Sequence, residues 1–171
     1  MRLRIWLSLL VLLTAGITAA QEKPDFTGQW ALLTPRDAGD AARGLSVRQW
    51  LEHRTSVRGV PIDIPHLAIE RQFQNGMRSE SYQIGIVGGI VGGLPAGASV
   101  SSWSTRYAVR WDGARLVIDT GRYSGPTQES GPYSEHDEVW SLDESGRLVM
   151  AVTDRESGSA PRTTELTYRR R

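Results

Sequence analysis

The chain has 171 residues, a formal net charge of +1 at pH 7 and no cysteine. The lack of cysteine excludes disulfides, thiolate metal sites and thiol catalysis. Because acidic and basic residues nearly balance, the sequence gives no electrostatic reason to expect nucleic acid or an anionic membrane surface as a partner.

The first 20 residues have the pattern of a cleavable export signal. Arg2 and Arg4 precede an apolar run over residues 5–13, and small residues follow up to Ala20. The run is shorter than the roughly 20 residues that span a bilayer. We therefore expect residues 1–20 to be a signal peptide and residues 21–171 to be one periplasmic or secreted domain without a stable membrane span. An uncleaved N-terminal anchor is the alternative.

Export without cysteine is typical of a bacterial envelope protein rather than of a small disulfide-stapled secreted domain. No cysteine follows the apolar run, so no residue is available to carry a lipoprotein lipid. Loss of Arg2 and Arg4 with the signal takes the formal charge from +1 to −1.

Residues 27–33 predict a first strand because they are rich in Trp, Leu and Thr, and Pro35 ends it. A different pattern follows. Val47, Trp50 and Leu51 stand at i, i+3 and i+4 behind Ser46, a good N-cap, which predicts a short amphipathic helix over residues 46–53. An ordered loop is the alternative for this segment.

Two prolines, Pro61 and Pro65, predict extended coil or a sheet edge over residues 57–65, because proline cannot donate to a ladder. From His66 the apolar residues alternate, and Asn75-Gly76 predicts a tight hairpin turn to a partner strand over residues 77–86. Arg71 falls on the apolar face of its strand. It either points into a barrel, where it could meet a ligand carboxylate, or marks a bulge.

Residues 87–98 are apolar but dense in glycine, which is unfavourable in strands and helices alike. We expect a loop at the rim of a barrel. A flap over a ligand cavity and a membrane-touching tip are the alternatives.

The second half of the chain alternates clearly. Tyr107, Val109 and Trp111 form a core face, Asp112-Gly113 makes a turn, and Leu116 continues that face on the return strand. Three further strands follow, and the residues that share one face of each are Glu138, Trp140 and Leu142; Leu148, Met150 and Val152; and Thr164, Leu166 and Tyr168. The sequence thus predicts an all-β fold of about eight antiparallel strands, closed as an up-and-down barrel or packed as a sandwich.

Gly28-Gln29-Trp30 opens the first strand, and Arg169 lies at the end of the last one. On these residues the chain resembles a lipocalin-type calycin. It is also similar to small exported bacterial proteins of unassigned function. The resemblance implies an up-and-down β-barrel in which Trp30 and Arg169 pair by a cation–π contact at the closed end.

One cluster is a candidate for metal binding or acid–base catalysis. It comprises residues 135–138, with the sequence Glu-His-Asp-Glu. In a strand His136 and Glu138 share a face, so they could bind a divalent metal or form an acid–base pair. A solvated, charged strand start is the simpler interpretation, because no second histidine is near in sequence. We assign no catalytic residue, no metal ligand and no cofactor.

The sequence favours a non-catalytic barrel that binds a small apolar or amphipathic molecule. The ligand-binding candidates are Arg71, Tyr107, Val109, Trp111 and Trp140. The alternative is a structural or protein-interaction module of the envelope that uses residues 87–98 or an exposed strand edge. A third hypothesis is an enzyme that uses His136.

Overall fold

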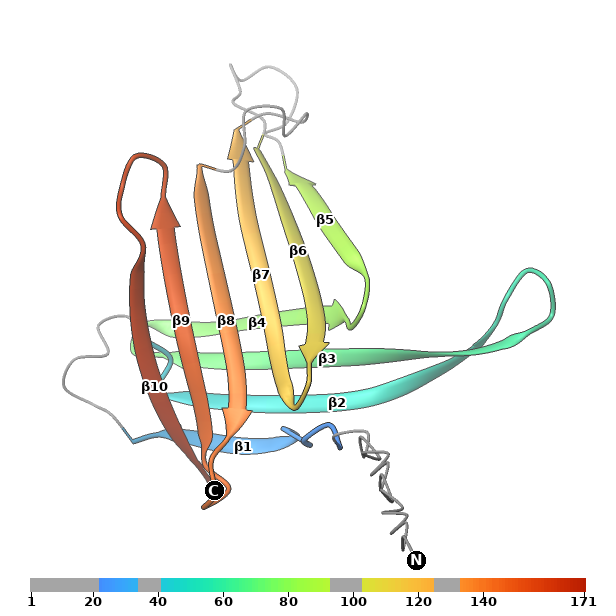
Figure 1. Cartoon of the computed structure of the whole chain (residues 1–171), viewed down its shortest axis with the longest axis horizontal. Coiled ribbons are helices and arrows are strands. Elements are labelled where there is room, and N and C mark those ends of the chain that lie inside the picture. The colour runs from blue at the N-terminus through green and yellow to red at the C-terminus, as the bar shows by residue number, and fades with distance from the viewer. Residues whose placement is uncertain (1–21, 34–40, 93–102, 125–132) are drawn as a thin grey trace, which may run out of the picture.

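Ten antiparallel strands form a single sheet that curls into a nearly closed barrel (Figure 1). The computed structural model describes residues 22–33, 41–92, 103–124 and 133–171. Its strands are β1 (Gly28–Leu32), β2 (Gly44–Thr55), β3 (Pro61–Phe73), β4 (Gly76–Gln83), β5 (Val87–Gly92), β6 (Trp103–Asp112), β7 (Arg115–Ser124), β8 (Ser134–Leu142), β9 (Leu148–Glu156) and β10 (Arg162–Arg170). Within these residues no helix has the length and apolar character needed to cross a membrane.

The sheet runs in the order β4-β3-β2-β1-β10-β9-β8-β7-β6-β5. In Figure 1, β2 to β4 lie across the direction of β6 to β10, so the two halves of the sheet face each other. β4 and β5 are the two edges, and no ladder joins them in the described residues. The predicted all-β antiparallel barrel is confirmed, with ten strands rather than about eight.

The helix expected over residues 46–53 is wrong, because these residues belong to β2. Leu45 and Val47 point into the core, while Trp50 lies on the other face and stacks on His66. Pairing with β3 runs along the whole of β2 and supplies its backbone hydrogen bonds. The helical spacing arose from apolar residues on two faces of one strand.

The two prolines lie where β3 is a sheet edge. β3 pairs with β2 from Pro61, but its ladder with β4 starts only at His66. Pro61 and Pro65 therefore remove no donor that a neighbouring strand needs. The prediction of extended coil or an edge is confirmed for residues 61–65, whereas residues 57–60 form the turn between β2 and β3.

The glycine-rich segment begins as a strand, not as a loop. Residues 87–92 form β5 and pair with β6, while residues 93–98 lie outside the described part. Gly88 explains part of the glycine content, since a Cβ there would stand 2.2 Å from Cζ of Tyr107. Glycine thus lets the Tyr107 ring lie against the edge strand. The expected signal peptide, residues 1–20, also lies outside the described residues.

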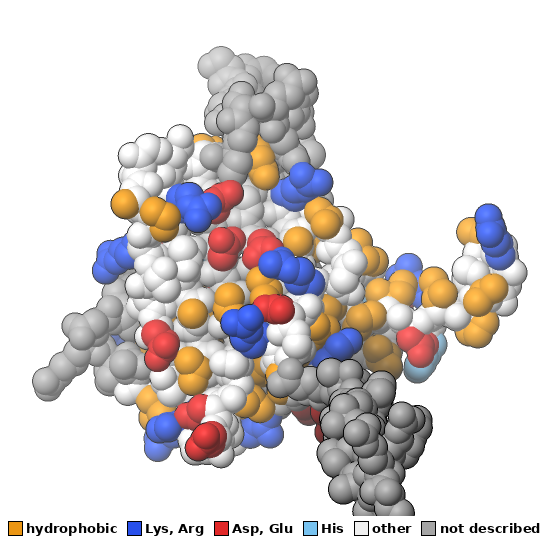
Figure 2. Space-filling model, viewed as in Figure 1, with side chains coloured by type: hydrophobic (Ala, Val, Ile, Leu, Met, Phe, Trp, Pro, Cys, Tyr) orange, Lys and Arg blue, Asp and Glu red, His pale blue; other side chains and the backbone are white. Residues whose placement is uncertain are grey.

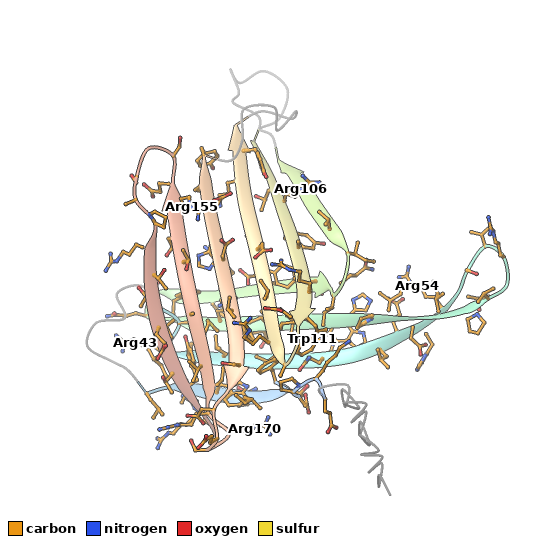
Figure 3. The ribbon with its side chains drawn as sticks, viewed as in Figure 1. Arg43, Arg54, Arg106, Trp111, Arg155 and Arg170 are labelled. Atoms are coloured by element: carbon orange, nitrogen blue, oxygen red, sulfur yellow. The ribbon has the colours of Figure 1, made fainter. Side chains whose placement is uncertain are left out.

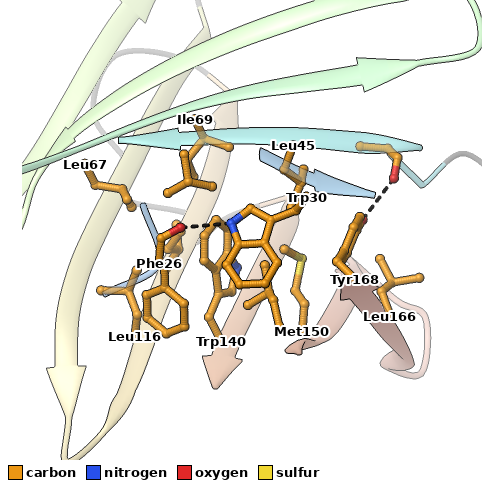
Figure 4. Packing of buried hydrophobic residues seen from close by; sticks show 14 of the residues in the cluster. Phe26, Trp30, Leu45, Leu67, Ile69, Leu116, Trp140, Met150, Leu166 and Tyr168 are labelled. Carbon is orange, nitrogen blue, oxygen red and sulfur yellow. Dashed lines mark hydrogen bonds between the residues drawn. The ribbon is translucent and has the colours of Figure 1, made fainter. Parts of the chain in front are cut away.

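The core gathers aromatic and aliphatic side chains from most strands near the closed end (Figure 4). Trp30 is 1% exposed, and its Nε1 donates to the carbonyl oxygen of Phe26 at 2.9 Å. The Phe26 ring stacks on Trp111 and meets Trp140 edge-on, with centroids 6.0 and 5.7 Å away. The hydroxyl of Tyr168 donates to a backbone carbonyl, so the buried phenol is satisfied.

The cation–π partner of Trp30 is Arg170, which corrects the expected pair of Trp30 and Arg169. The Arg170 guanidinium lies 4.9 Å from the Trp30 ring centroid and donates to the Asp25 carbonyl oxygen. β1 and β10 pair Trp30 with Arg170, so these two side chains share a face, and Arg169 points the other way. Gly28 has φ of +145°, a conformation that favours glycine, and lies under the Arg170 side chain.

Candidate functional site on the inner wall of the barrel

A layer of charged side chains crosses the barrel interior above the apolar core. Arg71 from β3 and Glu138 from β8 are 8% and 2% exposed. Nη2 of Arg71 lies 3.0 Å from the carboxylate of Glu138, although 67 residues separate the two in sequence. Nε of Arg71 donates to Glu80 of β4 at 3.0 Å. The ion pairs therefore join opposite sides of the barrel.

Glu138 accepts hydrogen bonds from three side chains. Besides Arg71, Nε1 of Trp140 donates to it at 2.8 Å, and Nε2 of His136 lies 2.8 Å from its other oxygen. Three partners offset much of the cost of removing a carboxylate from water. The alternation of β8 makes this possible, since His136, Glu138 and Trp140 all face inward.

His136 carries the polar layer toward solvent. Its Nδ1 lies 2.7 Å from a carboxylate oxygen of Asp154, the residue paired with it on β9. The His136 side chain faces inward but is 45% exposed, and that of Asp154 is 61% exposed. Solvent therefore reaches the inner wall at this height, whereas it does not reach Glu138 below.

The electrostatics of the layer follow from these contacts. Burial alone would raise the pKa of Glu138, but the charge of Arg71 and the hydrogen bond from His136 lower it to about 2. The hydrogen bond to Glu138, followed by that to Asp154, outweighs partial burial and raises the pKa of His136 to about 9. Glu138 is therefore ionised and His136 protonated at neutral pH.

This arrangement bears on the catalytic hypothesis for His136. Both imidazole nitrogens face carboxylate oxygens, so both donate, and the ring has no free nitrogen to accept a proton. A general base needs such a nitrogen within reach of the proton it removes. The contacts of His136 with Glu138 and Asp154 therefore fix three charged side chains in position and leave no base for catalysis. Among the described residues, no group of three or more His, Asp or Glu side chains has the arrangement of a metal site.

The five ligand-binding candidates lie at different depths. Arg71 belongs to the charged layer. Val109 and Trp140 are 1% and 0% exposed and form part of the packed core. Trp111 lies at the base against Phe26 (Figure 3). Tyr107 is partly buried on the inner wall and meets Tyr82 of β4 edge-on, with centroids 5.1 Å apart. Of the five, Tyr107 thus lies near the open half, and Arg71 and the other three belong to the buried floor.

Sequence reasoning paired Glu138 with His136 but not with Arg71, and it did not select Glu80, Tyr82 or Asp154 as site residues. One signal was present, because Glu138 falls between two inward positions of its strand. A carboxylate on an apolar face needs a cation, and Arg71 was the other charged residue on an apolar face. The partnership of Glu80 with Arg71 depends on the barrel bringing β3, β4 and β8 together.

A concave feature lies on the outer surface. It is a shallow groove of about 270 Å³ over β6 to β8, and its acidic side chains are Asp119, Glu135 and Asp137. Figure 2 shows acidic and basic side chains interspersed on this face. Arg110 pairs with Asp119, and Arg155 pairs with Glu135. Most of its lining residues face outward, away from the charged layer, although Tyr107 and Thr120 of the inner wall also contribute to it.

No known protein family, curated protein or solved structure matches this chain significantly.

Proposed function

We propose that this chain is an exported, lipocalin-like envelope protein that binds a small apolar or amphipathic molecule without catalysis. The observation that carries the proposal is the exposure of inward-facing side chains above a buried floor. His136 lies on the inner wall and is still 45% exposed, while Glu138 two residues further along the same face is 2% exposed. A β-barrel of about eight strands is just wide enough to hold one small ligand or to be filled by its own side chains, and the exposure of His136 favours the first at the open half.

The proposed site has a polar and an apolar part. His136, Asp154 and Glu80 offer charged hydrogen-bonding groups to a ligand head group. Tyr82 and Tyr107 form an aromatic wall beside them. An amphipathic molecule would place its polar end on the first group and its apolar body on the second.

Arg71 has a supporting role in this proposal. Its guanidinium is already paired with Glu80 and Glu138, so a ligand carboxylate would have to displace one of them. We assign Arg71 to the floor, where it fixes the two glutamates, rather than to direct capture of an anion.

A substitution that fills the proposed site with a large side chain tests the proposal. Thr120 pairs with His136 on the inner face of β7, so Thr120→Trp places a large ring in the proposed site. We expect native mass spectrometry with dodecanoic acid, dodecylamine and dodecanol to show one bound molecule of at least one probe on the wild-type protein. Thr120→Trp should weaken that binding at least tenfold.

The matched control is Asp119→Trp, which places the same ring on the outer face of the same strand. This variant should bind as the wild type does. The proposal fails if the wild type binds none of the probes and carries no co-purified molecule. It also fails if both tryptophan variants bind like the wild type.

A second candidate function is protein binding through the edge strand β5. Its six residues include no charge and no proline, the usual protections of a free edge, and Val87 is 56% exposed. A partner strand would pair with this edge. Val87→Lys should then abolish cross-linking to an envelope protein, whereas Val57→Lys, far along the chain from this edge, should not. Equal cross-linking by both variants would reject this function.

A further inference from the structure

A long two-stranded arm projects from the barrel. It comprises residues 48–65, which are β2 beyond Val47, a turn, and β3 up to Pro65. Figure 1 shows it extending away from the other strands, and Figure 3 places Arg54 on it. Two-stranded hairpins are marginally stable in water by themselves.

The arm exposes aliphatic side chains, which are visible along it in Figure 2. The exposed fractions are 54% for Leu51, 107% for Val57, 56% for Val60 and 41% for Ile62. Nothing in the described residues covers these side chains, so the arm has the composition of a contact surface.

The two edges of the arm differ in their capacity to accept another strand. On β3, the carbonyl of Pro65 accepts from Ile84, so odd-numbered backbone groups point away from β2. On the arm these outward-pointing positions are residues 61, 63 and 65. Two of them, Pro61 and Pro65, have no N–H. The β3 edge therefore offers a poor template for strand pairing.

The β2 edge is open. The amide of Gln49 donates to Oγ1 of Thr27 on the β1 side, so the amides of Leu51, His53 and Thr55 also point to that side. The ladder with β1 stops at Val47, and these three amides have no partner in the part of the chain that the structure describes. No proline interrupts this edge.

We propose that the β2 edges of two copies of this chain pair antiparallel around a two-fold axis at His53. A two-fold axis places His53 opposite His53 of the partner subunit, and Leu51 opposite Thr55 of the partner subunit. These are the positions whose backbone groups point outward. Three hydrogen-bonded residue pairs exchange about six backbone hydrogen bonds.

Charge selects this register. It places Glu52 opposite Arg54 of the partner subunit, and the symmetry repeats the pair. Within one chain Glu52 already pairs with Arg54 and His66, so the dimer would join two such groups into one network of alternating charge. Moving the axis to residue 52 sets Glu52 against Glu52 of the partner subunit. Moving it to residue 51 sets Arg48 against Arg54 of the partner subunit. Both shifts bring like charges together. An axis at residue 50 would also make two opposite-charge pairs, Arg48 with Glu52, but it sets residue 53 of one copy against Val47 of the partner subunit, whose edge is already occupied by β1.

The chain itself is the occupant that fits, because the edge is complementary to its own copy. Short paired edges bury less surface than a standard stable interface of about 800 Å² per partner. The dimer should therefore depend on concentration. It needs no residue of the ligand site, so it stands independently of the proposed function.

A cysteine cross-link tests the axis directly, since the natural chain has no cysteine. At the axis the two Cα atoms of residue 53 would lie roughly 5.5 Å apart, within disulfide range. His53→Cys under mild oxidation should convert most of the full-length protein to a disulfide dimer. The His53 side chain is 78% exposed and its partner Asp63 is 57% exposed, so losing this surface contact should cost little stability.

Val57→Cys is the matched control. Residue 57 is fully exposed but lies near the tip, so its two copies would be roughly 20 Å or more apart in the dimer. It should cross-link at least tenfold more slowly. Equal cross-linking at both positions would overturn the proposal.

A charge exchange tests the register in solution. Sedimentation equilibrium should show that Glu52→Arg and Arg54→Glu each weaken the wild-type dimer at least tenfold, with the double exchange restoring it. Far-ultraviolet circular dichroism checks that each variant is folded. A wild type that stays monomeric up to about 1 mM, or a double exchange no better than the singles, would contradict the proposed pairing.

Discussion

Glu138 is the buried carboxylate at the centre of the charged layer. It is a carboxylate at 2% exposure that remains ionised because Arg71, His136 and Trp140 all donate to it. The pairing satisfies the buried charge without necessarily adding stability, since two buried ions cost solvation energy. In the proposed function the charged layer serves selectivity for a ligand. Aliphatic side chains would be enough if the layer only had to fill the interior.

A paired substitution separates these effects. Arg71→Met removes the buried cation of Glu138 and leaves only the partly exposed His136 to pair with it, so the fold should be destabilised by about 3–5 kcal/mol. The double variant Arg71→Met, Glu138→Leu removes both charges and should recover most of that loss. Urea denaturation measures both. A double variant as unstable as the single one would mean that the ion pair is not the source of the cost.

Trp30 is the main residue of the closed end. It is 1% exposed, lies under Arg170 and donates to the Phe26 carbonyl. Trp30→Ala should lower the free energy of unfolding by about 3–5 kcal/mol, the range for removing a buried tryptophan. Denaturant unfolding checks this value. A loss below about 1 kcal/mol would show that the closed end is not organised around Trp30.

At the scale of elements, the place where the barrel nearly closes depends on side chains rather than on a ladder. Tyr82 of β4 and Tyr107 of β6 meet edge-on across the two sheet edges, and Gly88 of β5 leaves room for the Tyr107 ring. The barrel thus has a seam between β4 and β5 that aromatic contacts cover.

Gly88→Ala tests that seam. The new Cβ would stand 2.2 Å from the Tyr107 ring, so the ring must move and lose its contact with Tyr82. We expect a cost of about 1–3 kcal/mol, as for other overpacking substitutions. The same change in a Tyr107→Leu background should cost clearly less. Equal costs in the two backgrounds, measured by thermal unfolding, would exclude this contact as the reason for the glycine.

For the whole molecule, the sequence predicted the fold where alternation was regular and failed where it was not. The faces of β6 to β10 were predictable because each strand has one apolar face. β2 was not, since Trp50 packs on the outer face and imitates helical spacing. Arg170 follows from the parity of Leu166 and Tyr168, which the choice of Arg169 overlooked. The contacts of Arg71 with Glu80 and Glu138 depend on tertiary pairing and could not be predicted from local pattern.

The charged layer also makes global stability depend on pH. The pKa of Glu138 is depressed, so its contribution is present above about 4.5, the ordinary value, and is lost as pH falls toward about 2. The pKa of His136 is raised, so its contribution is present below about 6.5 and is lost as pH rises through about 9. Urea titrations should show flatter acid loss in Glu138→Gln and flatter alkaline loss in His136→Gln. Slopes equal to the wild type would contradict these shifts.

The central claim is that a ligand binds against the inner wall beside His136. The chain has three histidines, and the other two, His53 and His66, lie on the arm or at its base. The most direct test follows the imidazole resonances of all three by nuclear magnetic resonance while the probe that binds best in mass spectrometry is added. We predict a saturable shift of the His136 signals with His53 and His66 unchanged. Saturation of binding without a shift at His136, or equal shifts at all three histidines, would contradict the claim.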